Sequence, residues 1–225
     1  MKEQLEKDFK NIIKNLTLSQ KDIEIKKFCL ENFIDKGFPN RKEEDWKFSD
    51  LNQIINKNIG ELSFYSDYTS TNKVDTSVFV DGLEHNKIVF INGRIEKIDF
   101  DYEKKNQIEI IDQSEIINKF NNNNALSNLN NAFTNKTFKI LVKKGYKLEK
   151  PLIIYHTTNH KIWSKNINLR LDFELDKDSS LRIIDLFNDT SEKNFLNIFY
   201  NFDLKENSVL KNYKVDKFEN KNIKY

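Results

Sequence analysis

Three segments in the second half of the chain repeat one strand–turn–strand pattern. Each begins with the apolar end of a strand, passes through charged residues and a small or turn-forming residue, and reaches a leucine that opens the next strand. A unit recurring at this period is typical of stacked coils, because each coil buries its apolar side only against a neighbour. The segments are VKKGYKLEKPLIIYH, LDKDSSLRIIDLF and LKENSVLKNYKV, with leucines Leu148, Leu181 and Leu210 spaced 33 and 29 residues apart and aligned turn residues Gly145, Ser179 and Asn207.

The strands around these turns alternate apolar and polar side chains, as NINLRLDFEL and NFLNIFYNFDL illustrate. This alternation gives each strand one face toward a core and one face toward solvent. We therefore predict that residues 136–225 begin an elongated β-solenoid. An antiparallel β-sandwich is the structural alternative.

The N-terminal third has the periodicity of amphipathic helices. Ser19 is placed as an N-cap with Asp22 three residues later, which predicts the start of a second helix. Gly37 and Pro39 predict the end of that helix, since glycine suits a left-handed C-cap and proline cannot continue a helix. We expect the two helices to pack as a hairpin. Their apolar residues are Leu5, Phe9, Ile12, Ile13 and Leu16 in the first and Ile23, Phe28, Leu30, Phe33 and Ile34 in the second.

A β-hairpin is the strongest local signal in the chain. In KIVFINGRIEKIDF, two extended runs flank Asn92 and Gly93, the residue pair best able to adopt the positive φ angles of a tight turn. After this hairpin we expect a short strand at residues 108–111 and short helices at residues 114–120 and 125–133, on either side of a polar loop at 121–124.

These signals divide the chain into three parts. Residues 1–84 form a helical region with a linker, residues 85–135 hold the hairpin and short helices, and residues 136–225 start the β core. The expected fold class is mainly β with an α-helical N-terminal region.

Charge and composition exclude several function classes. The 37 basic and 35 acidic residues give a net charge of +2, without the basic excess of a nucleic-acid-binding protein. The chain has no apolar stretch long enough to cross a bilayer, and its charged start lacks the apolar core of a signal peptide. A single cysteine cannot form an internal disulfide, so we expect a reducing, cytoplasmic setting with no nucleic-acid or membrane partner.

Residues with catalytic or metal-binding chemistry are few. With five glycines, the chain has neither a Walker motif nor a dinucleotide fingerprint. Cys29 is expected to be a structural thiol in the second helix. His156 and His160 are expected at the end of a strand and in the loop that follows it, without a metal, and His85 stands alone before the hairpin. Glu43 and Glu44 are expected to lie at a helix start, where negative charge is favoured.

The stretch GFPNRKEEDWKFSDL, residues 37–51, resembles the N-terminal signature of the SufD family of the Suf-type iron–sulfur cluster assembly machinery. Three later stretches are similar to the family in the same order: IVFINGRI with its Asn-Gly pair, ALSNLNNAFTNKTFKILVKKGYKLEKPLIIYH, and the repeated coil turns. The resemblance covers roughly residues 37–215. The matching positions are Gly37, Pro39, Arg41, Glu44, Trp46, Lys47, Phe48, Ser49, Leu51, Asn92, Gly93 and Pro151.

The resemblance implies a helical N-terminal region followed by a right-handed parallel β-helix. It also implies a non-catalytic scaffold subunit that works with a SufB-like paralogue and the SufC-like ATPase. Such a subunit binds no cofactor stably, and an iron–sulfur cluster is present only transiently in the assembled complex. Family members are longer, with later coils and a C-terminal helical domain, so we expect this chain to be a short or truncated form.

The signature residues are expected to be structural, with Trp46, Phe48 and Leu51 in the core. No catalytic, cofactor-binding or metal-binding residue is expected in this chain. The alternatives are a stand-alone protein-interaction module and a β-solenoid enzyme that acts on polysaccharide. The acidic residues nearest to what such an enzyme needs are Asp172, Asp176, Asp178 and Asp185, which do not recur from coil to coil.

Overall fold

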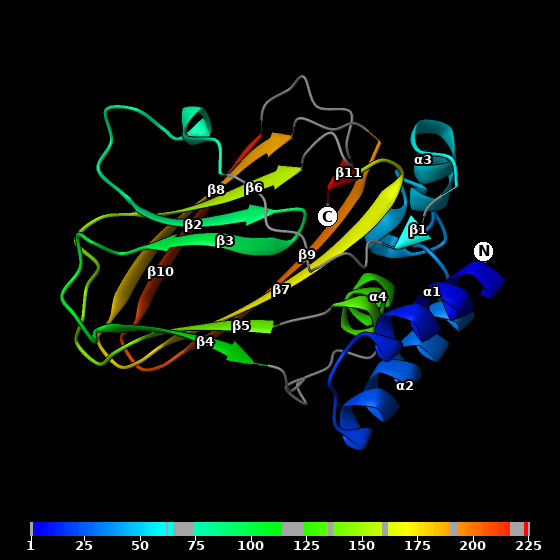
Figure 1. Cartoon of the computed structure of the whole chain (residues 1–225), viewed down its shortest axis with the longest axis horizontal. Helices are drawn as coiled ribbons and strands as arrows, with labels where there is room; N and C mark the ends of the chain where they lie inside the picture. Colours follow the sequence, from blue (N-terminus) through cyan, green and yellow to red (C-terminus); the bar gives the residue numbers. More distant parts are fainter. Residues whose placement is uncertain are drawn as a thin grey trace.

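The computed structural model describes residues 2–61, 63–64, 74–113, 124–134, 137–158, 162–189, 193–216 and 223–224. In these residues the fold is mixed α/β. Helices gather at the N-terminal end, and strands form two mixed sheets that face one another (Figure 1).

The N-terminal helices begin and end close to where the sequence places them. Helix α1 spans Lys2–Lys14, α2 spans Gln20–Lys36, the short 3-10 helix η1 spans Glu44–Trp46, and α3 spans Leu51–Asn58. The side chain of Ser19 accepts a hydrogen bond from the Asp22 amide at 3.1 Å, which confirms the predicted N-cap. Gly37 ends α2 as predicted, and its N–H donates to the Phe33 carbonyl at 2.7 Å, but its φ of 71° and ψ of −167° differ from the left-handed helical conformation expected there.

The buried face of α2 differs from the predicted one. Phe28 is exposed, whereas Lys26 and Cys29 are buried. The reason is the position of α4, spanning Ala125–Phe133, which is buried along its whole length and is the main helical neighbour of α2. Both α1 and α2 reach α4, so the expected simple hairpin of two helices is not the main packing unit. The helix predicted at residues 125–133 is confirmed, and the one predicted at 114–120 lies outside the described residues.

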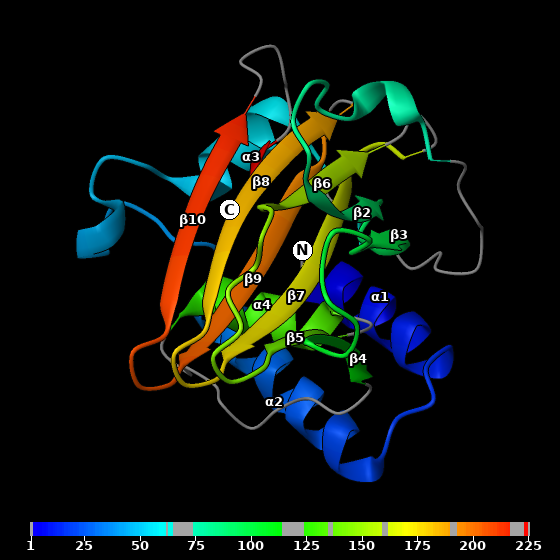
Figure 2. The same ribbon diagram turned by 90° about the vertical axis from the view of Figure 1, so that its left-hand side faces the viewer.

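Strands alternate between the two sheets from the fifth strand onward (Figures 1 and 2). One sheet has the order β11-β9-β7-β5-β4, with β1 also on β7, and the other has the order β10-β8-β6-β2-β3. The strands are β1 Ser63–Phe64, β2 Asn86–Ile91, β3 Arg94–Asp99, β4 Ile108–Gln113, β5 Thr137–Val142, β6 Leu152–Thr158, β7 Lys165–Leu175, β8 Ser180–Asp189, β9 Phe195–Leu204, β10 Val209–Asp216 and β11 Ile223–Lys224, and the 3-10 helix η2 spans Thr76–Val78.

The pairing between strands is parallel along both sheets, with two exceptions. Only β2–β3 and β4–β5 are antiparallel among the described pairs. An antiparallel sandwich therefore does not describe the second half of the chain. In both sheets the last long pairs share one offset, since Asn166 pairs with Phe195 and Ser180 with Val209, each 29 residues apart.

The repeated turns stack on one another. Backbone N–H groups of Gly145 and Asp178 donate to carbonyls of the next turn, at 2.8 Å to Lys177 and 3.1 Å to Glu206. The left-handed position of each turn is Gly145, Asp178 or Asn207, with φ of 73°, 60° and 56°. The prediction that Ser179 is the turn residue of the second repeat is therefore wrong by one residue, because Asp178 occupies the left-handed position. Ser179 instead donates its backbone N–H to the Asp176 carbonyl at 3.2 Å and closes the turn.

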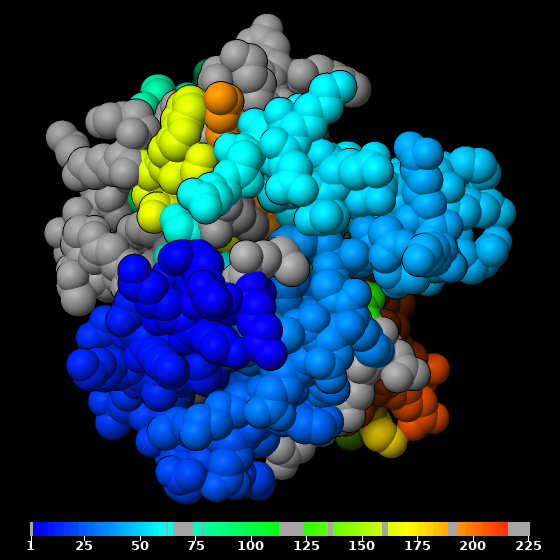
Figure 3. All heavy atoms as spheres, turned by 90° about the vertical axis from the view of Figure 1, so that its right-hand side faces the viewer, coloured from blue at the N-terminus to red at the C-terminus, as the bar shows by residue number. Residues whose placement is uncertain are grey.

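The buried apolar residues form two main cores, one between the two sheets and one between the helices and a sheet. One lies between the sheets and contains Leu148, Leu181 and, at its edge, Leu210. The other lies between the helices and the outer face of the six-stranded sheet, where Phe195 of β9 meets the helical residues. Figure 3 shows the N-terminal helices covering this end of the molecule.

Candidate functional site

The signature segment is a surface loop anchored at a few points. The Leu51 amide donates to the Pro39 carbonyl at 3.0 Å and closes the loop. Leu51 is buried, as predicted, whereas Trp46 was expected in the core and is only partly buried against it. Arg41 and Glu44 are exposed.

Phe48 is the exception, because 86% of its surface is exposed. The prediction that it lies in the core is wrong. It follows Trp46 by two residues across a 3-10 turn, which advances about 120° per residue, so the two side chains point in different directions. Lys47 lies 5.2 Å above the Phe48 ring and forms an ion pair with Glu44 at 2.9 Å. The segment therefore presents one aromatic ring and several charges to solvent.

Asn92 and Gly93 form the predicted hairpin turn, with φ of 53° and 79°. Gly93 is needed for a second reason, since a Cβ there would lie 2.7 Å from Cγ2 of Ile167 in β7. Pro151 comes just before β6, and its carbonyl accepts the Asn86 amide at 2.9 Å where β2 begins. Gly93 thus lets the hairpin turn lie close to β7 of the other sheet, and Pro151 bonds to the start of the hairpin.

A histidine, an aspartate and a tyrosine meet between the two sheets, where the sequence predicted no site. His156 Nε2 lies 3.1 Å from Asp185 Oδ1 and 2.9 Å from Tyr200 Oη. The Tyr200 hydroxyl also donates to Asp185 Oδ1. His156 lies near the end of strand β6, as predicted, whereas Asp185 belongs to β8, so the expectation that it lies among turns is wrong.

The surroundings of this cluster are apolar. The His156 ring stacks between Phe90 and Phe187, with ring centroids 5.6 and 4.8 Å away. Burial, and then the nearby Asp185 carboxyl, raise the pKa of Tyr200 well above its usual value. Asp185 Oδ2 is buried and has no hydrogen-bond partner among the described residues. The cluster therefore joins β9 of one sheet to β6 and β8 of the other through polar bonds inside the core.

The chemistry available to the cluster is limited by access. A carboxyl, an imidazole and a phenol could together move a proton. The cavity that His156 lines has a volume of about 10 Å³, close to that of one water probe and too small for an organic substrate. We assign the cluster the role of a cross-sheet clamp.

A second buried polar group lies where α2, α4 and β7 meet. Lys26 Nζ donates to the carbonyls of Asn131, Ala132 and Thr134 at 3.1, 3.4 and 2.5 Å. These are the last carbonyls of α4, which have no partner within the helix. Burial lowers the pKa of Lys26 to about 8 and raises the pKa of Cys29 to about 11. Cys29 is thus a buried, protonated thiol, in agreement with the structural role predicted for it.

The four candidate aspartates of a polysaccharide-acting enzyme do not form one groove. Asp172 lies beneath the helices and accepts Arg170 Nε at 3.1 Å, while Asp185 lies inside the core. Asp176 and Asp178 lie in the stacked turns. His160 lies outside the described residues, so its pairing with His156 stays untested. In the described part of the chain, no three His, Cys, Asp or Glu side chains are placed to hold a metal ion.

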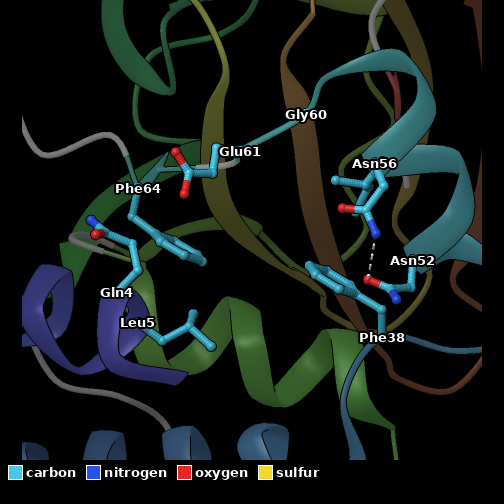
Figure 4. Close-up of a pocket in the computed structure, with 9 residues that line it drawn as sticks. Gln4, Leu5, Phe38, Asn52, Asn56, Gly60, Glu61 and Phe64 are labelled. Carbon is cyan, nitrogen blue, oxygen red and sulfur yellow. Dashed lines mark hydrogen bonds between the residues drawn. The ribbon is translucent and has the colours of Figure 1, made fainter. Parts of the chain in front are cut away.

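One cavity of about 380 Å³ opens between α1, α3 and β1 (Figure 4). Phe38 and Phe64 lie on opposite sides of it with Leu5 below, and Glu61 reaches in beside Phe64. Its volume is within the range of small-ligand sites. The full lining is Gln4, Leu5, Phe38, Asn52, Ile55, Asn56, Gly60, Glu61 and Phe64, in which Glu61 is the charged residue.

None of the described helices is long and apolar enough to span a membrane. No protein-family model matches the chain, and no curated protein matches it.

Proposed function

We propose that this chain is a SufD-like scaffold subunit of an iron–sulfur cluster assembly complex, built on a right-handed parallel β-helix. The resemblance of four ordered segments to the SufD family supports the family. The observation that carries the fold is the regular return of the chain: strands alternate between the two sheets, and the last long parallel pair in each sheet has the same offset of 29 residues. A right-handed path is the usual one for parallel crossovers.

The stacked turns support the same proposal. Each turn hydrogen-bonds to the next through its backbone, and Asn207 Nδ2 also donates to Asp178 Oδ1 at 3.1 Å. Lys177 and Glu206 pair across neighbouring turns at 2.8 Å. Repetition of one contact at one position of every coil is how solenoid proteins gain stability from neighbour to neighbour.

The scaffold acts through the strand edges at the β10 end. Exposed apolar side chains gather on the last two long strands: Phe202 and Leu204 of β9 and Val209, Tyr213 and Val215 of β10. A strand edge beside apolar side chains is a template for further strand pairing. A SufB-like paralogue pairs at this end, and the SufC-like ATPase joins the assembled complex. The complex works in the cytoplasm without nucleic acid or membrane, and the cluster passes through it without residing on this chain.

Co-purification with SufB-like and SufC-like partners tests the proposal. Val215→Lys on β10 and Ile98→Lys on β3 form a matched pair, because both side chains are apolar, lie in edge strands of the five-stranded sheet, and are 46% and 45% exposed. We expect Val215→Lys to weaken partner binding at least tenfold, or about 1.4 kcal/mol. Ile98→Lys should leave binding unchanged.

Two results would contradict the proposal. Failure of the unaltered chain to bind either partner would remove the family assignment. Equal loss of binding in both lysine variants would remove the β10 end as the contact.

A further inference from the structure

A segment before the hairpin lies across the outer face of the five-stranded sheet. This strap, residues 74–85, contains η2 and ends where β2 begins. Val74, Phe79 and Val80 of the strap pack against a buried apolar group on the sheet. That group consists of Val89 and Ile91 of β2 and Ile153 and Tyr155 of β6.

A tyrosine and a histidine fasten the strap. Tyr155 Oη accepts the Val80 backbone N–H at 3.0 Å and lies 2.7 Å from His85 Nε2. The other ring nitrogen, His85 Nδ1, lies 2.6 Å from the Leu83 carbonyl oxygen. The Phe79 ring adds a contact, with its centroid 4.9 Å from that of Tyr155.

These contacts are best satisfied by a neutral imidazole. A carbonyl oxygen only accepts, so His85 Nδ1 carries the proton and donates to Leu83. His85 Nε2 is then an acceptor, which the Tyr155 hydroxyl fills with its own proton. A second proton on the ring would turn Nε2 into a donor, so the tyrosine proton would lose its acceptor.

The charged groups around His85 come from both strands of the hairpin. Lys87 Nζ of β2 lies 3.4 Å from the His85 carbonyl and 3.4 Å from Asp99 of β3. Lys97 of β3 lies over the Phe79 ring at 5.7 Å. Burial lowers the pKa of His85, and Lys87 lowers it further, while the bond to Leu83 and the Asp99 charge raise it. Because the pKa of His85 is lowered when the strap is in place, the closed state binds the neutral ring more favourably than the charged one, and a lower pH favours release of the strap.

We propose that the strap is an acid-sensitive cover, which protonation of His85 releases from the outer face of the five-stranded sheet. Release uncovers the apolar group beneath it. In register, Tyr155 continues into Leu186 and Val215, and Ile153 continues into Ile184 and Tyr213. Opening thus joins the covered residues and the apolar residues of β8 and β10 into one face that crosses four strands.

The test uses the full chain with Phe79→Trp, whose indole emission reports whether position 79 is covered. Between pH 7.5 and pH 5 we expect a shift of the emission to longer wavelength, with unchanged far-ultraviolet circular dichroism. The opening constant should rise by up to about tenfold per pH unit below the ordinary histidine value near 6.5. The same chain without Phe79→Trp supplies the background from Trp46 and Trp163.

Substitutions in the same background identify the group that titrates. His85→Gln should abolish the pH-dependent shift, whereas His160→Gln should keep it. Tyr155→Phe removes the acceptor of the Val80 amide, so its emission should lie at longer wavelength already at pH 7.5. The proposal is overturned if Phe79→Trp shows no shift, if His85→Gln retains the shift, if His160→Gln removes it, or if Tyr155→Phe keeps the covered emission at neutral pH.

Discussion

The two edges of the five-stranded sheet are built differently. The β3 edge belongs to a tight hairpin and carries charged residues, among them Glu96 and Lys97, with Lys87 and Asp99 paired beside it. The β10 edge carries Val209, Tyr213 and Val215, all about half exposed. Charges and short hairpins are the usual means by which proteins protect an edge strand from further pairing.

The two edges therefore differ in how readily each could pair with another strand. Exposed apolar side chains are more numerous on β10, which carries three of them beside three charged residues, than on β3, where Ile98 is exposed among four charged residues. The side chains on the inner face change in the opposite direction, from apolar near the hairpin to charged toward β10. In register from β2 through β6 and β8 to β10, one row of side chains runs Ile88, Ile154, Asp185 and Lys214.

Gly93→Ala should break the protected edge and has the largest expected effect. An alanine there combines a positive φ with a Cβ 2.7 Å from Ile167. We expect a loss of about 3 kcal/mol in the free energy of unfolding, measured by urea titration. Gly82→Ala is the matched control, because Gly82 has a φ of 70° but nothing within 4 Å of a Cβ. It should lose about 1 kcal/mol, and equal losses in the two variants would show that the contact with Ile167 is unimportant.

Asp185→Ala should weaken the interior next to the β10 edge. It removes the carboxyl that accepts the Tyr200 hydroxyl and lies beside His156, leaving these two buried polar groups with only each other as partners in the cluster. The expected loss is about 2 kcal/mol of unfolding free energy, with Asp185→Asn losing less because an amide oxygen still accepts. A loss below about 0.5 kcal/mol for the alanine variant would contradict the clamp role.

Val215→Lys should reduce self-association while leaving the stability of the monomer nearly unchanged. The β10 edge pairs with no further strand among the described residues, which predicts that the purified chain associates with itself as its concentration rises, as sedimentation velocity would measure. A lysine on an edge strand opposes this pairing, so the monomer fraction should increase. Ile98→Lys, on the β3 edge, should not change it. If the chain stays monomeric at high concentration, the proposal that the β10 edge pairs with another copy of the chain is contradicted.

Phe48→Ala should have the smallest effect on stability and self-association. It tests whether exposure of an apolar side chain is enough to drive association, or whether the side chain must also lie on a strand edge. Phe48 is far more exposed than Val215, but it lies in the signature loop and not on a strand edge. We expect a change within about 0.5 kcal/mol in stability and no change in self-association. A monomer fraction that rose as much as in Val215→Lys would show that any exposed apolar residue drives association.

Features set by neighbours in the sequence were predicted well. The Ser19 cap, the Gly37 end of α2, the Asn92–Gly93 turn and helix α4 all follow from local chemistry, and the structure confirms each one. The repeated turns were also found, although the prediction missed Asp178. Asp178 occupies the left-handed position with a φ of 60°, three residues before Leu181, just as Gly145 and Asn207 lie three residues before Leu148 and Leu210.

Features set by distant parts of the chain were missed. The burial of Lys26 depends on carbonyls of α4 more than 100 residues away in the sequence. His156, Asp185 and Tyr200 come from three strands, and only the pairing of those strands brings them together. The sequence did contain one signal for this cluster. His156, Asp185 and Tyr200 each lie two positions after an isoleucine, namely Ile154, Ile183 and Ile198. Residues two apart in a strand point to the same face, so the three polar side chains share the inward face of those isoleucines.

Hydrogen exchange along β10, with and without a SufB-like partner, tests the central claim most directly. The claim is that the β10 edge of a SufD-like scaffold takes the partner. Backbone amides of residues 209–216 should exchange at least tenfold more slowly in the complex, while amides of β3 keep the same rates. Unchanged exchange in β10 on binding, or equal protection of β3, would contradict the account.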